Sequence, residues 1–218
     1  MDYMEEYLRW CNNSATDKKL SDDLKMICDS EATIKDAFSC NLKFEFGRME
    51  GIIGAGPNRM NTHTIAKATQ ALTYYLMRQG GFLHITIAYD SHPKSKEFAE
   101  MAACVCAANV TTAYIWPEPM PSSVVPFVAE YLHLDGGILI TTSNALEQKT
   151  LYSLYGNNGT SLSLNVAKEI QAIYDTLDVF DDVHFSVFSD GLKRCRIQYL
   201  VAFVYDAFMS REANKNNA

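Results

Sequence analysis

A serine and two threonines follow an apolar, strand-like run, and their hydroxyl groups are the first candidates for chemistry. The run covers residues 136–141, and the segment at its end reads Thr141-Thr142-Ser143-Asn144. A serine placed there can act as a nucleophile or accept a phosphoryl group. Serine and threonine in such loops also cap turns without any chemical role. No Gly-x-Ser-x-Gly motif surrounds Ser143, which argues against a hydrolase serine.

A glycine-rich segment is the second candidate. The loop GIIGAG, residues 51–56, leads through Pro57, Asn58 and Arg59 toward an expected helix N-terminus. Backbone N–H groups, the helix dipole and Arg59 could together hold a phosphate. The loop matches neither a Walker motif nor a dinucleotide fingerprint. A glycine-rich turn that allows tight packing explains it equally well.

Other reactive residues give weaker patterns. Asp90-Ser91-His92 contains the residue types of a catalytic triad, but triad members come from separate loops and adjacent residues cannot form the relay. The five histidines show no metal-ligand spacing, and the six cysteines include no pair of Cys-x-x-Cys units. A zinc site is therefore not expected, and reduced, buried cysteines are.

The periodicity of apolar residues indicates which elements position these candidates. The first forty residues read as helices, with Ser14 or Ser21 as an expected cap, and residues 42–46 read as a strand followed by a loop over 47–61. Thr62 or Thr64 is the expected cap of the next helix. Strands over 85–89, 111–115, 136–141 and 151–155 then alternate with helices over 94–108, 124–132 and 164–177. This rhythm predicts an α/β fold: a three-layer α/β/α domain with a mainly parallel sheet, preceded by an N-terminal helical arm.

Three parts of the chain are expected. Residues 1–40 form the helical arm, and residues 41–180 form the α/β/α domain. Residues 181–218 form a C-terminal extension with a strand over 183–188, an apolar helix over 200–208 and a polar tail. Because ligands bind at the carboxyl ends of parallel strands, the loops at 47–61, 89–95, 116–123 and 141–150 are where a site is expected.

Composition and charge exclude several classes of protein. A hydrophobic content of 48% is typical of a globular protein, and a net charge of −7 argues against nucleic-acid binding. The acidic N-terminus does not resemble a signal peptide, and the longest apolar stretch, residues 197–209, is too short to span a membrane. A cytoplasmic protein is therefore expected.

Three segments, taken in order and spacing, are more specific than any one motif. They read GAGPNRMN from residue 54, IAYDSHPKSKEFAEMAACVCAAN from residue 87 and GGILITTSN from residue 136. Together they resemble the first domain of the α-D-phosphohexomutases, the phosphoglucomutases and phosphomannomutases. The resemblance runs from about Tyr7 to the C-terminal helix. It implies a three-layer domain that is the first of four in a complete family enzyme.

The resemblance also implies a chemistry. In that family a phosphoserine in this domain donates its phosphoryl group to a sugar phosphate, and its phosphate binds Mg²⁺. The serine loop reads roughly Thr-Ala-Ser-His-Asn-Pro, so Ser143 takes the phosphoserine position and would meet a metal only through its phosphate. The side chains expected to contact a phosphate are those of Arg48, Asn58, Arg59 and Asn144.

The chain departs from the family pattern around this serine. Asn144, Ala145 and Leu146 replace the histidine, asparagine and proline of the loop, and Glu50 stands where an arginine is expected. His92 replaces a second arginine; Met120-Pro121-Ser122-Ser123 stands for the Arg-Pro-Thr-Pro loop and Thr150-Leu151 for an Asn-Gly pair. The metal loop, the sugar loop and a further phosphate loop belong to other domains of the family. Mg²⁺ is thus expected in a complete enzyme and not on this chain alone.

Three functions remain open at this point. The first is a degenerate, single-domain relative that is not a competent mutase. The second is a phosphoserine-bearing subunit or fragment of an active phosphohexomutase, which would meet a hexose phosphate only when other domains complete it. The third is a binding or assembly module, in which the apolar C-terminal helix (Leu200, Phe203, Val204, Phe208) contributes to a homo-oligomer.

Overall fold

The computed structural model describes residues 2–14, 17–80, 83–143 and 148–216. In this part of the chain a seven-stranded sheet has the order β1-β2-β6-β5-β3-β4-β7. Its strands are β1 (Phe44–Glu45), β2 (Arg48–Ile52), β3 (Leu83–Tyr89), β4 (Thr111–Ile115), β5 (Gly136–Thr142), β6 (Lys149–Gly156) and β7 (Ile197–Tyr199). The helices are α1 (Tyr3–Asn13), α2 (Lys18–Ile27), α3 (Glu31–Phe38), α4 (Thr62–Met77), α5 (Pro93–Ala108), α6 (Val124–Tyr131), α7 (Leu164–Thr176), α8 (Phe188–Lys193) and α9 (Ala202–Asn216).

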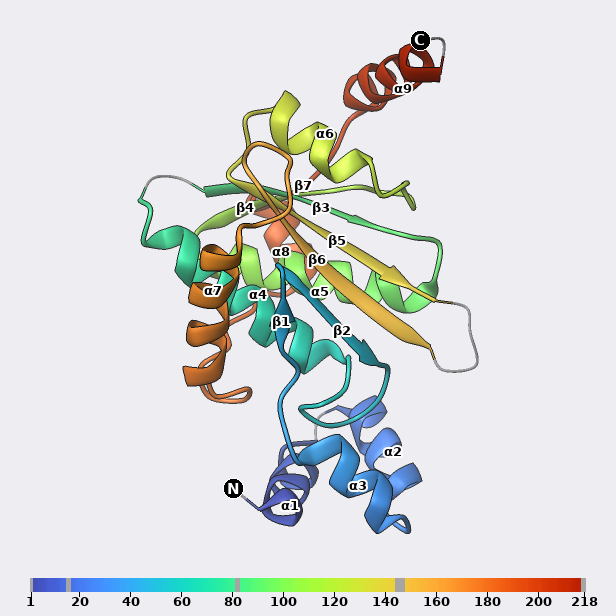
Figure 1. The fold of residues 1–218 in the computed structure, drawn as a ribbon, viewed down its shortest axis with the longest axis vertical. Helices are drawn as coiled ribbons and strands as arrows, with labels where there is room; N and C mark the ends of the chain where they lie inside the picture. The colour runs from blue at the N-terminus through green and yellow to red at the C-terminus, as the bar shows by residue number, and fades with distance from the viewer. Residues whose placement is uncertain (1, 15–16, 81–82, 144–147, 217–218) are drawn as a thin grey trace.

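Helices cover both faces of the sheet, so the predicted three-layer α/β/α fold is confirmed (Figure 1). Strands β5, β3, β4 and β7 are parallel neighbours, as the alternation of strands and helices predicts. Strands β1, β2 and β6 are antiparallel to their neighbours. The change occurs at β6 because the connection from β5 is too short for the crossover that a parallel strand needs.

The prediction of a loop over residues 47–61 is wrong for the first part of that range, because strand β2 lies there. Glu45 pairs with Arg48, so Phe46 and Gly47 form a two-residue turn between β1 and β2. Both turn residues have positive φ, 51° and 75°, as a type I′ hairpin turn requires. This hairpin carries Arg48 and Glu50 to the edge of β6.

The two faces of the sheet have separate cores. On one face, Ile85, Ile87 and Ile140 of the parallel strands pack with buried residues of α4, α5 and α7. On the other face, Ala88 and Leu139 pack with α6 and with the start of α9. The strands are apolar on both faces because each face is covered, which is the pattern of a buried parallel sheet.

The helical arm, α1–α3, has its own small core around Trp10, which is fully buried. The Trp10 ring contacts the rings of His63 and Phe180 edge to face, and through them the arm packs on the α/β domain. Asp17, rather than Ser14 or Ser21, caps α2: its side chain accepts a hydrogen bond from the Leu20 N–H. The arm lies below the β1–β2 hairpin in the view of Figure 1.

Residues 181–218 contribute β7 to the same sheet, where Ile197 pairs with Ala113 of β4. The strand predicted over 183–188 is not formed. Its backbone N–H groups bond elsewhere, from His184 to the Gln70 side chain and from Ser186 to the Cys104 carbonyl. This segment therefore crosses α4 and α5 instead of joining a strand.

The C-terminal helix was expected to offer an apolar contact surface, and most of that set is in the core. Leu200, Val204 and Phe208 are buried against α6, and only Phe203 of the four is exposed. None of the helices in the described ranges is long and apolar enough to cross a membrane.

Candidate functional site

A buried cluster of polar groups lies at the carboxyl end of β5. The Thr142 hydroxyl accepts a hydrogen bond from Ser95 Oγ at 2.8 Å and lies 2.9 Å from Thr150 Oγ1. The Thr142 backbone N–H donates to Oδ2 of Asp90 at 2.7 Å. Asp90 follows β3, so the ends of two parallel strands are held together beside Ser143.

Ser143 is exposed and directly follows the last residue of β5. Its backbone N–H donates to the Lys149 carbonyl at 2.9 Å, and its Oγ accepts from the Lys149 N–H at 3.2 Å. The serine is thus fixed at a strand end, as the sequence predicts. Asn144, predicted to contact phosphate, lies outside the described residues together with the rest of 144–147.

A shallow hollow of about 370 Å³ opens next to Ser143. Its walls are Glu50, Thr141, Thr142, Ser143, Lys149 and Leu151. Glu50 reaches it from β2, and its carboxylate lies 3.9 Å from the Lys149 ammonium. Both side chains are about half exposed, at 59% and 48%. The charged side chains of this hollow are therefore one carboxylate and one ammonium, and they neutralise each other.

This set of side chains does not fit a divalent metal. Mg²⁺ prefers several carboxylate or phosphate oxygens in octahedral geometry. The hollow offers one carboxylate, which already has an ammonium beside it, together with hydroxyl groups. Among the residues that the structure describes, no group of three His, Cys, Asp or Glu side chains could hold a metal ion.

Arg48 and Asn58 lie on a neighbouring, larger hollow of about 930 Å³. Glu50 and Leu151, which pair across β2 and β6, belong to the walls of both hollows. Ser143 is on one side of this pair, and Arg48 is on the other. The sequence prediction is that Arg48 and Asn58 contact phosphate; the structure places them near Glu50 and outside the walls of the Ser143 hollow.

Arg59 has a structural role in the arm contact. Its guanidinium forms an ion pair with Asp36 of α3 and donates to the Asn58 carbonyl at 2.9 Å. The Asn58 side chain donates to the Asp36 carbonyl at 2.8 Å, and its N–H donates to the Ala37 carbonyl at 3.0 Å. Both side chains therefore join the glycine-rich loop to the helical arm.

The glycine-rich loop is closed by hydrogen bonds within itself. Asn61 caps α4, in place of the predicted Thr62 or Thr64, and its amide donates to the carbonyls of Gly54 and Gly56 at 2.9 and 3.0 Å. The Gly54 and Arg59 N–H groups donate to carbonyls within the loop. Tight packing accounts for this segment.

His92 and Met120, which replace family residues, also have local roles. His92 Nδ1 accepts from the Lys94 N–H at 3.2 Å and caps α5, while its own N–H donates to Oδ1 of Asp90 at 3.0 Å. Asp90 therefore orders a turn and does not relay protons to an imidazole. The Met120 N–H donates to the Tyr89 carbonyl at 2.9 Å, and the Met120 side chain is buried.

Lys149 is the residue of this site that sequence reasoning missed. It lies in the segment 141–150 and carries no motif, but it begins β6 directly opposite Ser143. The sequence offered one signal for the position of Lys149, which was the predicted strand over 151–155. A strand that begins so soon after β5 must start near the serine. Without the antiparallel register, the position of Lys149 could not be derived.

The fold and this strand end define a class of protein: a three-layer α/β/α domain with an exposed serine where β5 ends. The family described as "Phosphoglucomutase/phosphomannomutase, alpha/beta/alpha domain I" matches residues 42–179. The chain belongs to this family.

Individual relatives agree with this assignment. Human phosphopentomutase is 30% identical over 184 residues, covering 79% of this chain and 30% of that protein. A Staphylococcus aureus phosphoglucomutase is 31% identical over 140 residues, covering 64% of this chain and 25% of that protein. A phosphoglucomutase/phosphomannomutase family protein of Burkholderia thailandensis has the same fold, with a TM-score of 0.55 at 16% identity over 76% of this chain and 34% of that one. The chain thus spans about a third or less of each of these proteins.

Proposed function

We propose that this domain by itself is a degenerate relative of the phosphohexomutases and does not catalyse phosphoryl transfer. The observation that carries the proposal is the Glu50 carboxylate beside Ser143, with Lys149 as its counter-ion. The family relationship connects the chain by descent to sugar-phosphate metabolism. A cytoplasmic location belongs to the same proposal and is supported by six free cysteines.

The charge balance supports this proposal. A phosphoserine carries about −1.5 to −2 charges at neutral pH. The Lys149 ammonium would have to serve both that phosphate and Glu50, which leaves the phosphate without net cationic compensation. A carboxylate 4 Å from a phosphate opposes it by about 1 kcal/mol per charge pair even in water. Because phosphoryl transfer depends on positioning and charge neutralisation, Ser143 in this setting is a weak nucleophile.

A direct test is phosphorylation of the purified chain. We expect intact-mass analysis after incubation with glucose 1,6-bisphosphate and Mg²⁺ to detect no added phosphoryl group. Assays should also detect no interconversion of glucose 1-phosphate and glucose 6-phosphate. Stoichiometric phosphorylation that disappears in Ser143→Ala would overturn the proposal.

A second candidate function rests on the retained serine. Ser143 is fixed at the strand end by Lys149, so the domain could serve as the phosphoserine-bearing part of a phosphohexomutase completed by further domains. Such a protein would be an intramolecular phosphotransferase acting on hexose phosphates. Activity restored by adding domains two to four of a family enzyme, and lost in Ser143→Ala, would favour this function over the first.

An assembly role is the third candidate, and exposed apolar side chains around β7 and α9 support it. Tyr199, Val201, Phe203, Tyr205 and Met209 are each 42–59% exposed. Light scattering at increasing concentration tests for a homo-oligomer. A monodisperse monomer would remove the support for this role.

A further inference from the structure

Strand β7 forms an edge of the sheet, and no further strand lies beside it in the described ranges. It pairs with β4 on its inner side, where the Arg196 carbonyl accepts a hydrogen bond at 2.8 Å and the Leu200 N–H donates one at 3.0 Å. Because the backbone groups of a strand alternate in direction, the N–H and C=O groups of Ile197 and Tyr199 point away from β4. They form a short template for a strand of another molecule.

Exposed apolar side chains are concentrated around this edge. Seven of the fourteen large hydrophobic residues that are exposed in the described ranges lie within residues 185–209. Phe185 and Val187 precede β7, and Val201 and Tyr205 follow it, each 42–65% exposed. Such a concentration is typical of a surface that meets another protein. The strand is therefore flanked by apolar side chains at both of its ends.

Helix α9, which follows β7, packs on one side only. Val204 and Phe208 are buried against α6, whereas Val201, Tyr205 and Met209 are 42–53% exposed. Their spacing of four residues gives a second apolar stripe along the helix. This stripe is one wall of an open hollow of about 650 Å³. In Figure 1, α9 extends beyond α6 and away from the sheet.

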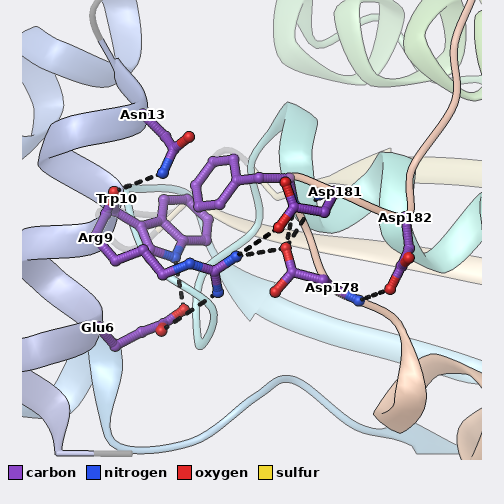
Figure 2. A network of polar contacts seen from close by, with 8 residues as sticks. Glu6, Arg9, Trp10, Asn13, Asp178, Asp181 and Asp182 are labelled. Carbon is purple, nitrogen blue, oxygen red and sulfur yellow. Dashed lines mark hydrogen bonds and ion pairs between the residues drawn. The ribbon is translucent and has the colours of Figure 1, made fainter.

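The helical arm at the other end of the chain shows the opposite situation. A cavity of about 290 Å³ lies where the arm meets α4 and α7, and its walls include Glu6, Arg9, Lys67 and Tyr174. Arg9 donates to Asp178 and lies 3.8 Å from Glu6, a network that Figure 2 shows. The arm thus docks through contacts of the chain with itself, whereas the outer side of β7 has no strand to pair with in the described ranges.

We propose that a second copy of this chain pairs with β7 edge to edge, in antiparallel orientation about a two-fold axis at Gln198. This pairing rests on the assembly role, the third candidate function above. Ile197 of each copy then faces Tyr199 of the other, and each facing pair exchanges both of its N–H and C=O bonds. A shift of register in either direction would leave Ile197 or Tyr199 opposite a residue outside the strand.

The charges beside the strand favour the antiparallel orientation. Lys193, Arg194 and Arg196 precede β7. Parallel copies would place these cations side by side, which is unfavourable, whereas antiparallel copies hold them at opposite ends of the strand pair. The antiparallel orientation also places Val201, which follows the strand in one copy, beside the residues that precede it in the other. Because both copies use the same surface, the assembly closes as a dimer.

Gln198 gives a sharp test, because it faces its own counterpart across the two-fold axis. We expect sedimentation of the unmodified chain to show a monomer–dimer equilibrium. Gln198→Lys and Gln198→Glu each set two like charges opposite each other, which should raise the Kd of the dimer about fivefold or more. An equimolar mixture of the two variants should restore the dimer, because lysine then faces glutamate.

Controls separate this contact from general effects of charge. Gln79→Lys and Gln79→Glu, at an exposed glutamine after α4, are the matched controls and should dimerise as the unmodified chain does. Circular dichroism establishes that each variant is folded. If a Gln198 variant is not, Tyr199→Pro carries the test: it removes an N–H that points away from β4, a position where an edge strand tolerates proline, and it should weaken the dimer.

Three results would overturn the proposal. They are a monomer at every concentration, a Kd that is unchanged in the folded Gln198 variants, and a mixture of the two charged variants that does not recover the dimer. A monomer would also remove the assembly role. A dimer that does not respond to Gln198 would leave that role in place and remove only the pairing at β7. None of these results depends on whether Ser143 is phosphorylated.

Discussion

The hollow at Ser143 and the cavity at Lys67 differ in how their polar groups are satisfied. At Ser143, the Thr142 N–H bonds Asp90, the Ser143 N–H bonds the Lys149 carbonyl and Glu50 faces Lys149. At Lys67, the ammonium lies over the Tyr174 ring, and the buried Tyr174 hydroxyl has no hydrogen-bond partner in the described structure. The first region holds the serine to which the family resemblance points, and the second holds a buried hydroxyl without a hydrogen-bond partner.

This difference separates two kinds of evidence for function. Family resemblance led to Ser143, because the position of a serine at a strand end persists while its neighbours change. The second region is marked by the unpartnered Tyr174 hydroxyl beside Lys67, because such buried groups destabilise a fold unless something compensates for them. The comparison can be tested by altering one region and measuring the other.

Trp10→Ala should cause the largest loss in free energy of unfolding. It removes a side chain that belongs both to the core of the arm and to the wall of the Lys67 cavity. Trp10 is fully buried, and loss of a buried aromatic side chain costs about 3–5 kcal/mol in free energy of unfolding. Urea denaturation should show this loss. The amide signals of Ser143 and Lys149 should remain native in any folded fraction, because that region contacts no arm residue in its hollow.

Phe203→Ala is the matched control for aromatic loss, because Phe203 is 59% exposed. Its free energy of unfolding should change by no more than about 0.5 kcal/mol. If Trp10→Ala were equally mild, the arm would not be an integral part of the fold and the cavity would have no fixed wall.

Much of the fold could be predicted from the sequence, since buried parallel strands read as apolar runs. The segments that became β3, β4 and β5 have this character, and Ser143 was correctly placed at a strand end. Strand β2 was missed because it is only five residues long, contains Gly51, and follows the hairpin turn Phe46-Gly47, which lacks the usual Asn-Gly signature. Local pattern cannot reveal a turn of unusual composition.

The partners of the site residues depended on contacts between distant parts of the chain. Arg59 was expected at phosphate, but it pairs with Asp36, which a different helix supplies. Lys67 reads as an ordinary polar residue of a helix, and its burial arises only when α1 and the far end of α7 pack around it. Charge on the surface and charge in a cavity look alike in a sequence.

Lys67→Met should change the free energy of unfolding less than Trp10→Ala does, and in the opposite direction. Because the pKa of Lys67 is lowered in the folded chain, the environment disfavours the ammonium, and an apolar side chain of similar length should stabilise the protein. Urea denaturation at neutral pH measures this gain.

The pH dependence of the protein's stability follows from the same lowered pKa of Lys67. Between the lowered pKa of Lys67 and the unfolded lysine value of about 10.4, the unfolded chain holds more protons at this residue, so the stability of the unmodified chain rises with pH. The advantage of Lys67→Met should therefore shrink as the pH rises through that window. A variant that is less stable at neutral pH, or an advantage that does not vary with pH, would show that Lys67 does not carry an unfavourable buried charge.

The smallest effect is expected from Glu50→Gln, which removes the carboxylate beside Ser143. The Glu50–Lys149 pair is half exposed, so the free energy of unfolding should change by no more than about 0.5 kcal/mol. Removing one negative charge near a bound phosphate is worth about 1 kcal/mol at 4 Å in water, which corresponds to roughly a fivefold gain in affinity. Titration with inorganic phosphate, followed at the Ser143 and Lys149 amides, measures this gain.

Glu45→Gln, in the neighbouring hollow, is the matched control and should leave these signals unchanged. If Glu50→Gln and the unmodified chain respond alike, Glu50 does not set the phosphate affinity of the Ser143 hollow, and the charge argument for an inactive site loses its basis.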